Sequence, residues 1–418
     1  MNHAAVQRSH RHRYLTPDRI RRQLVLLAVM LWAIAIAAAA TPTWRLRTGQ
    51  VKGTDFVHFY TLARVGATRP PQGFADLNVQ RALQLAARPE SHDDWYPPVY
   101  GPQVAAALAP LGFLSYGWAL AVWLSISGAA YLFLMRRTIR AARRVSAFTG
   151  LAVAGAVAFP PFWELVLHGQ LSVVAMAAAI AACVALQRGR ARLAGALLGV
   201  LGYKLSLFIP ALAVLVVSGA WTMALCACAV AAAQVLLGAL VAGPGSLMAY
   251  ARMLIDSPAL IGTLAAKPYQ MHSWRAFWLL VSPSPSAALA LYVVCSALTV
   301  AAAAIIWRRT ADPTLRISAL ALATVLCAPH LYVYDLVILA PVWIWLIDWY
   351  LDRPDLNPNI GRLLYAGYAA PLAGPVVARF AHVQISTLCF AALLAYLWRD
   401  RAGSRERSGA GRAELIGT

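Results

Sequence analysis

Long apolar runs recur along the whole chain, and they constrain its fold more than any other feature. LVLLAVMLWAIAIAAAA (24–40) and SAALALYVVCSALTVAAAAIIW (286–307) are two examples, and a helix needs about 20 apolar residues to cross the hydrocarbon core of a bilayer. Of the 418 residues, 61% are hydrophobic and only 12% are charged, whereas a typical soluble domain is about 25% charged. The sequence therefore predicts an all-α, polytopic membrane protein.

The positive charges gather at the ends of the apolar runs, although a formal net charge of +20 alone would also suit a nucleic-acid-binding protein. The clusters are RSHRHRYLTPDRIRR (8–22), MRRTIRAARR (135–144), QRGRAR (187–192), WRRT (307–310) and WRDRAGSRERSG (398–409). Cytoplasmic loops of membrane proteins are enriched in Arg and Lys, and anionic lipids attract such segments. We therefore place these clusters in the cytoplasm and expect membrane lipids as partners. The sequence shows no soluble domain that could bind nucleic acid, so no nucleic-acid partner is expected.

The same pattern divides the chain into three parts. Residues 1–23 form a basic cytoplasmic N-terminus, and 24–40 resembles an uncleaved signal-anchor that makes the first span. Residues 24–398 form a single transmembrane domain. Residues 399–418 are polar and carry no fold signal, so we expect a disordered cytoplasmic tail.

The middle of the chain breaks the alternation of spans. The basic clusters at 188–192 and 308–309 both belong in the cytoplasm, but three single crossings between them would not return the chain there. A pair of short helices within 193–217 that enters and leaves on the cytoplasmic side removes the conflict. Candidate positions for the break are Gly199, Gly202 and Tyr203-Lys204.

This break has consequences for topology and for the site. Non-helical backbone deep in a membrane is tolerated where it lines a polar cavity or is buried in protein, so the break is expected to face a cavity. Counting spans by the positive-inside rule gives about 12 transmembrane helices, two of them short and within 193–217. The segments 41–100 and 243–285 then lie outside the cytoplasm as large loops, and long loops are often functional.

The stretch GTDFVHFYTLARVG (53–66) places a carboxylate in the first of these loops. A helix starting here would carry Asp55 and His58 on one side by i, i+3 spacing. Phe56, Phe59 and Tyr60 would spread over the remaining surface, as in a helix that lies in the membrane interface. The alternative for Asp55 is a purely structural one, as the N-cap of that helix.

Two further polar motifs lie close to predicted spans. In HGQ (168–170), His168 and Gln170 face a site or only solvate a helix end. Lys204 lies within an apolar segment, where a lysine costs about 2.5–3.5 kcal/mol on insertion scales and should face a cavity or an anion. The alternative is a lysine whose amino group snorkels to the cytoplasmic surface.

Three other motifs fall at predicted outer boundaries. Tyr96 belongs to WYPPVYGP (95–102), which also fits an interfacial aromatic belt. APHLYVYD (328–335) brings His330 and Asp335 to the start of a span, where an ionisable pair suggests function; the alternative for Asp335 is a helix cap. QMHSWR (270–275) adds His272 and Arg275 at the end of the second loop.

The order of these motifs identifies a resemblance. TDFVHFY, WYPPVYGP, APLGFL, HGQLS, GYKLSLFIP and APHLYVYD follow one another between residues 50 and 345. This series resembles the bacterial glycosyltransferase family 87, the polyprenol-phosphate-mannose-dependent mannosyltransferases of the multi-span GT-C class. Two positions differ from the family's pattern, because Leu171-Ser172 follows HGQ and Leu205-Ser206 follows Lys204. The nucleotide-binding and hydrolase motifs GxGxxG, P-loop, HExxH and GxSxG are not in the sequence.

The resemblance implies a GT-C-type fold with a large first extracytoplasmic loop, and Asp55 as catalytic base. It implies transfer of a hexose, with mannose expected, from a polyprenyl-phosphate donor to a lipid or glycan acceptor. The reaction would invert the anomeric centre, at the extracytoplasmic face of the bacterial inner membrane. Neither a cofactor nor a divalent metal is expected. Residues expected to bind donor phosphate or substrate are His58, Tyr60, Tyr96, His168, Gln170, Lys204, His272, Arg275, His330 and Asp335.

Two other functions fit the same pattern of helices and polar groups. A transporter or flippase for a lipid-linked substrate would also use a broken helix that bears a lysine. Against this, the chain has no internal repeat, and its polar groups gather at one predicted face of the membrane. A non-catalytic assembly subunit would keep the fold and lose the reaction.

Overall fold

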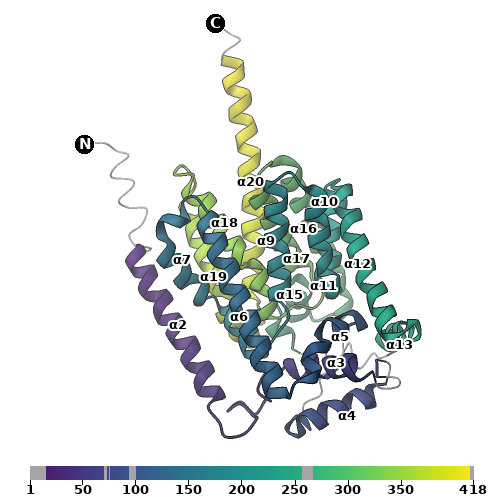
Figure 1. The fold of residues 1–418 in the computed structure, drawn as a ribbon. Coiled ribbons are helices and arrows are strands. Elements are labelled where there is room, and N and C mark those ends of the chain that lie inside the picture. Colours follow the sequence, from purple (N-terminus) through teal and green to yellow (C-terminus); the bar gives the residue numbers. More distant parts are fainter. Residues whose placement is uncertain (1–15, 70–72, 75, 94–99, 257–266, 415–418) are drawn as a thin grey trace.

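A computed structural model of the protein describes residues 16–69, 73–74, 76–93, 100–256 and 267–414 (Figure 1). Helices dominate these residues, and the extended pairing among them is limited to two isolated bridges, Arg45 with Val51 and Met271 with Tyr332. The predicted all-α class is therefore confirmed.

Five helical stretches are long and apolar enough to cross a membrane. They are α2 (Pro17–Ala39), α6 (Tyr116–Ala141), α12 (Trp221–Ala242), α16 (Pro285–Arg309) and Val333–Leu351, which joins η6 (Val333–Leu339) to α18 (Ala340–Leu351). A bent pair adds a sixth candidate: η3 (Val145–Phe148) and α7 (Thr149–Val157) meet α8 (Pro160–His168) at 44°. The bend falls where Pro160 and Pro161 begin α8, because proline cannot continue the preceding hydrogen-bond ladder.

The other apolar helices are shorter than a full span or are interrupted. They are α5 (Pro102–Leu108) with η2 (Ala109–Phe113), α9 (Val173–Gln187), α10 (Ala191–Gly199) with η4 (Val200–Tyr203), α11 (Leu205–Val217), α17 (Pro313–Cys327) and the apolar part Ile385–Arg399 of α20 (Ile385–Glu414). Two prolines, Pro371 and Pro375, lie inside α19 (Asn359–Ala381). The described residues thus give five or six membrane-capable helices by length and composition, and the predicted count of about 12 remains a prediction.

The break expected within 193–217 lies at Lys204, whose extended backbone (φ −134°, ψ 92°) separates η4 from α11. Gly195, Gly199 and Gly202 pack in turn against Met223, Ala227 and Ala231, so α10 runs alongside α12. At the far end of α11, the Arg308 guanidinium donates hydrogen bonds to the carbonyls of Val217 and Ser218. The segment therefore forms two short helices that meet at Lys204.

The helices α3 (Phe56–Thr68), α4 (Leu77–Ala87), α5 and α13 (Pro244–Asp256) gather at one end of the bundle, the lower end in Figure 1. We refer to this as the α3 end. The opposite end, where α6 and α18 finish, carries Arg143 and Arg144 paired to Asp352. We refer to it as the basic end. The two segments predicted to be long outer loops, 41–100 and 243–285, thus contribute helices to the same end.

The sequence predicted that α3 exposes a face to the membrane interface, but the structure buries this helix within the protein. Every side chain from Phe56 to Ala63 is buried, and α3 packs against α4, α5 and η2. At Gly66 an added Cβ would lie 2.4 Å from the carbonyl oxygen of Ala105, so the backbones of α3 and α5 touch directly. Phe56, Val57 and Val65 lie on different sides of α3 and are all 0% exposed, so this stretch packs into a protein core.

Candidate active site

The backbone turns sharply just before Asp55. Gly53 has φ of +81° and Thr54 has φ of +26°, a left-handed conformation that is strained for a residue with a Cβ and is often found at functional sites. Asp55 occupies the N-cap position of α3, but its carboxylate makes no capping hydrogen bond. Instead it accepts a hydrogen bond of 2.5 Å from Nε2 of Gln170. The structure therefore gives this carboxylate a tertiary partner and not the capping role of the structural alternative.

The HGQ motif brings Gln170 to Asp55 through its central glycine. Gly169 has φ of +63° and lies against Phe56, where an added Cβ would be 2.8 Å from the Phe56 Cβ. The indole of Trp123 donates a 2.9 Å hydrogen bond to the Gly169 carbonyl. Gln170 is 4% exposed, so its amide is fixed by packing on all sides.

We expect Gly169→Ala to displace Gln170 from Asp55 and to lower activity. A left-handed φ costs an L-residue about 1–2 kcal/mol, and here the new methyl group would also meet Phe56. A displacement of about 1 Å can lower a reaction rate about 10²-fold. The transfer rate should therefore fall much further than the small change in the free energy of unfolding would explain. The matched control is Gly189→Ala, where φ is +70° but nothing lies within 4 Å. Equal activity in the two purified variants would contradict this role of Gly169.

A second carboxylate, that of Asp335, is held in an ion pair with Lys204. The Lys204 ammonium lies 2.6 Å from Oδ1 and 2.7 Å from Oδ2 of Asp335, and the Ser172 hydroxyl donates to Oδ1 at 2.7 Å. Asp335 is fully buried (0% exposed), and the Lys204 side chain is 10% exposed. Asp335 also accepts from the Tyr332 backbone N–H and completes a capping box at η6. Asp335 is therefore an ion-pair partner that also helps to cap η6, as its third residue, with Tyr332 at the N-cap.

The partners of the two carboxylates are two residues apart in the chain. Gln170 bonds Asp55 and Ser172 bonds Asp335, and two residues span at most about 7 Å. Burial, followed by the charges of Asp335 and Asp55, raises the pKa of Tyr100 well above its usual value. Burial and then the charge of Asp55 raise the pKa of Tyr332 to about 12. The negative charges of both carboxylates thus raise the pKa of the same two phenols, Tyr100 and Tyr332.

His168 has a partner of its own. Its Nδ1 lies 3.1 Å from Oε2 of Glu164, one helical turn earlier in α8, and its ring contacts that of Tyr334 with centroids 5.6 Å apart. The Lys204 ammonium lies 5.7 Å from the centroid of the same Tyr334 ring. His168 is therefore grouped with Lys204 and Asp335 around Tyr334.

His58 and Tyr60 follow Asp55 on α3 and are both buried. The His58 ring contacts the Tyr100 ring at 5.7 Å, which connects it to the group around the two carboxylates. The Tyr60 hydroxyl donates to the Leu114 carbonyl at 2.7 Å, and burial raises its pKa. Its contacts join α3 to the chain before α6, and a role in substrate binding remains a prediction.

The second predicted loop reaches the same region through Met271, which bridges to Tyr332. His272 is fully buried, with Nδ1 2.6 Å from the Ser386 hydroxyl, and burial lowers its pKa to about 3. Its hydrogen bond is therefore with α20 and not with Asp55. Arg275 donates a 3.0 Å hydrogen bond to the Pro329 carbonyl, and the ring of the next residue, His330, contacts Tyr332 at 5.0 Å.

Tyr96 lies outside the described residues. Three residues that complete the cluster, Glu164, Ser172 and Tyr100, were not predicted from the sequence. Glu164 is the acid four residues before His168, a spacing that places two side chains on one face of a helix, so this pair was detectable. Ser172 and Tyr100 meet their partners only through tertiary packing and give no local signal.

Within the described residues, no group of three or more His, Cys, Asp or Glu side chains is placed to hold a metal ion. The polar cluster consists of three carboxylates, a lysine, a histidine, an amide, a hydroxyl and several phenols.

The chain matches the sequence profile of glycosyltransferase family 87 over residues 99–329, more than half of its length. No curated protein and no solved structure matches it significantly. The matched region contains HGQ and Lys204 but not Asp55, His330 or Asp335, which are joined to it by the contacts described above. The extent of this match shows that the chain belongs to glycosyltransferase family 87.

Proposed function

We propose that the protein is a membrane hexosyltransferase that moves a sugar, with mannose expected, from a polyprenyl-phosphate donor to a lipid or glycan acceptor. The fold is proposed to be of the GT-C type, with about 12 transmembrane helices by the positive-inside count. The observation that carries the proposal is the half-buried carboxylate of Asp55. This carboxylate accepts a hydrogen bond from the neutral amide of Gln170 and makes no capping hydrogen bond to α3.

The different partners of the two carboxylates support a division of roles. Asp335 is buried against Lys204, so its negative charge is balanced and its oxygens are occupied. Asp55 accepts a hydrogen bond from Gln170, which orients the carboxylate without neutralising it. A general base must keep a free lone pair and a fixed direction. Asp55 meets both conditions, and Asp335 serves to position Lys204 and the start of η6.

The leaving polyprenyl phosphate needs a cation. Lys204 and His168 each lie against an acidic side chain, Asp335 and Glu164. Arg275 is bonded instead to a backbone carbonyl, that of Pro329, which leaves its positive charge uncompensated by any acid among its described contacts. An arginine fork can also bind phosphate through two parallel hydrogen bonds. Arg275, with His330 nearby, is therefore the preferred phosphate ligand in this proposal.

The reaction is then a single displacement. Asp55 takes the proton from the acceptor hydroxyl as that oxygen forms a bond to the anomeric carbon. The bond between this carbon and the phosphate oxygen breaks, and the polyprenyl phosphate leaves with the electron pair. Attack from the side opposite the leaving group inverts the anomeric centre. Proton transfer to a positioned carboxylate contributes about 10²–10⁴-fold to such a rate.

The test is transfer of labelled sugar in proteoliposomes that contain the purified protein, polyprenyl-phosphate mannose labelled in the sugar, and a lipid and glycan extract of the cell envelope as acceptor. The proposal expects label joined covalently to a component of the extract. A transporter or flippase would move the labelled donor across the bilayer with its sugar–phosphate bond intact. A non-catalytic subunit would do neither, and either of these results would contradict the proposal.

The proposed site faces the outside of the inner membrane, and labelling of single cysteines tests this side. In a background without the native cysteines, Gly245→Cys on α13 at the α3 end should react with an impermeant thiol reagent in cells whose outer membrane alone is opened. Gly245 is exposed, with nothing near its Cβ position. Ala147→Cys, exposed at the basic end, is the matched control and should react only after the inner membrane is opened. The reverse pattern would overturn the proposed orientation.

A further inference from the structure

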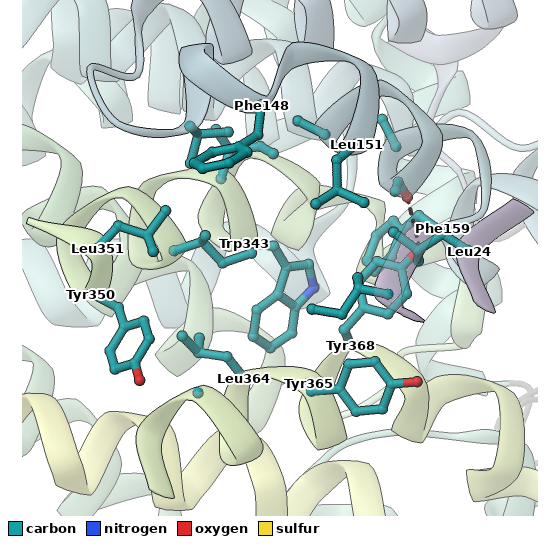
Figure 2. Close-up of a pocket in the computed structure, with 18 of the residues that line it drawn as sticks. Leu24, Phe148, Leu151, Phe159, Trp343, Tyr350, Leu351, Leu364, Tyr365 and Tyr368 are labelled. Carbon is teal, nitrogen blue, oxygen red and sulfur yellow. Dashed lines mark hydrogen bonds between the residues drawn. The ribbon is translucent and has the colours of Figure 1, made fainter. Parts of the chain in front are cut away.

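A cavity of about 690 Å³ lies near the basic end of the bundle, away from the site around Asp55 (Figure 2). Tyr116 at the start of α6 packs against Phe56, whereas Met135 near the end of α6 lines the cavity. By the helical rise these two residues are about 28 Å apart. The volume falls within the range of about 300–1,000 Å³ that is typical of ligand pockets. The cavity is therefore large enough for a ligand and is separate from the catalytic cluster.

The walls of the cavity are almost entirely apolar. Figure 2 shows Phe148 and Leu151 of the η3–α7 segment on one side and Leu364 and Tyr365 of α19 on the other. The Tyr131 and Tyr368 hydroxyls at its edge already donate to the carbonyls of Ala156 and Gly155. Such a lining favours a hydrocarbon chain.

One polar group in this lining has no partner. Figure 2 shows the Trp343 indole extending from α18 into the middle of the cavity. Trp343 is 3% exposed, and its Nε1 is buried without a hydrogen-bond partner in the described structure. A buried N–H without an acceptor is costly, so a ligand that fits this cavity should carry an oxygen as well as a hydrocarbon chain.

The charges beside the cavity point to an anionic ligand. Arg362 lines the cavity and is exposed, and Thr16 and Pro17 at the start of α2 form another part of its wall. The first turns of α2 also carry three exposed arginines and one acid; these residues are Arg19, Arg21, Arg22 and Asp18. Exposed arginines close to a bilayer attract anionic headgroups.

We propose that this cavity binds an anionic ester-linked phospholipid from the leaflet at the basic end. One acyl chain fills the apolar cavity, an ester carbonyl accepts the Trp343 N–H, and the phosphate lies near Arg362 and the first turns of α2. A polyprenyl phosphate shares the chain and the charge but has no ester carbonyl to accept from Trp343. The site does not depend on the proposed catalytic activity.

The test is native mass spectrometry of the protein released from nanodiscs of phosphatidylglycerol and phosphatidylcholine in equal amounts, with added polyprenyl phosphate. The wild type is expected to retain one phosphatidylglycerol. Ala152→Phe, which fills the cavity from α7, should lose it, while Ala129→Phe, at an exposed position of α6, should keep it. Trp343→Phe keeps the apolar shape and removes only the N–H, so it should reduce retention by about 2- to 10-fold.

Several outcomes would overturn the proposal. Retention of polyprenyl phosphate or of phosphatidylcholine at the same level as phosphatidylglycerol would exclude an anionic ester lipid. Unchanged retention in Ala152→Phe would place the lipid elsewhere on the protein, as would a complete absence of retained lipid in the wild type. Should Ala152→Phe not fold, Trp343→Phe and Arg362→Gln decide the matter, because unchanged retention in both would contradict the assigned contacts.

Discussion

Replacing Asp55 by Asn should lower sugar transfer by about 10²–10⁴-fold, the usual contribution of a general base. The amide has nearly the same shape as the carboxylate, and the residue is not needed as a side-chain cap of α3. The hydrogen bond from Gln170 would also survive, since the carbonyl oxygen of the introduced amide can accept it. The unfolding temperature of the purified protein in detergent should therefore stay close to that of the wild type.

The control for Asp55→Asn is Asp93→Asn at the α3 end of the protein. Asp93 has a side chain that is 78% exposed and an Arg45 contact at 3.6 Å, so its replacement should change neither stability nor transfer. Both variants are compared by initial rates in the proteoliposome assay. If Asp55→Asn keeps more than about a tenth of the wild-type rate, Asp55 is not the base, because removal of a general base costs at least about 10²-fold.

Replacing Lys204 by Met should destabilise the fold by about 3–5 kcal/mol, the cost of breaking a buried ion pair on one side. The reason is that Asp335, fully buried, would be left as a charge without its cation. Met matches the length and the apolar stem of Lys, so packing changes little. This result would identify Lys204 as half of an ion pair that holds the two short helices α10 and α11 against η6.

A double variant separates the charge from the packing. Lys204→Met combined with Asp335→Asn removes both charges. The single carbonyl oxygen of the new amide can still accept from Ser172, whereas the Tyr332 N–H, which bonds the other carboxylate oxygen at 3.3 Å, loses that partner. The double variant should regain most of the stability that Lys204→Met loses, as measured by chemical unfolding in detergent. A Lys204→Met protein within about 1 kcal/mol of the wild type would contradict a buried pair of this kind.

The sequence predicted features that follow from periodicity and from helix-breaking residues. Apolar runs predicted the all-α membrane class, and the charge count predicted the break within 193–217, which lies at Lys204. The burial of α3 was not predicted, although apolar residues on several sides of a helix favour a place in a core. That mistake came from reading the aromatic residues after Asp55 as a membrane-interface pattern.

The pairing of the candidate site residues was beyond the sequence. Lys204 and Asp335 are 131 residues apart, and Gln170 and Asp55 are 115 apart. Each residue was singled out for its own local context, and no local pattern says which residue each one meets. Only the packed helices show that residues 170 and 172 connect the two carboxylates.

The most direct test of the catalytic account is a cryo-electron microscopy structure of the Asp55→Asn protein with polyprenyl-phosphate mannose and an acceptor analogue. The account predicts the acceptor hydroxyl within about 2.6–3.2 Å of the side chain at position 55, the reach of a general base. It also predicts the anomeric carbon about 3–3.5 Å from that hydroxyl oxygen, and the phosphate beside Arg275. A donor whose sugar is bound at the basic end, or whose anomeric carbon lies away from residue 55, would contradict it.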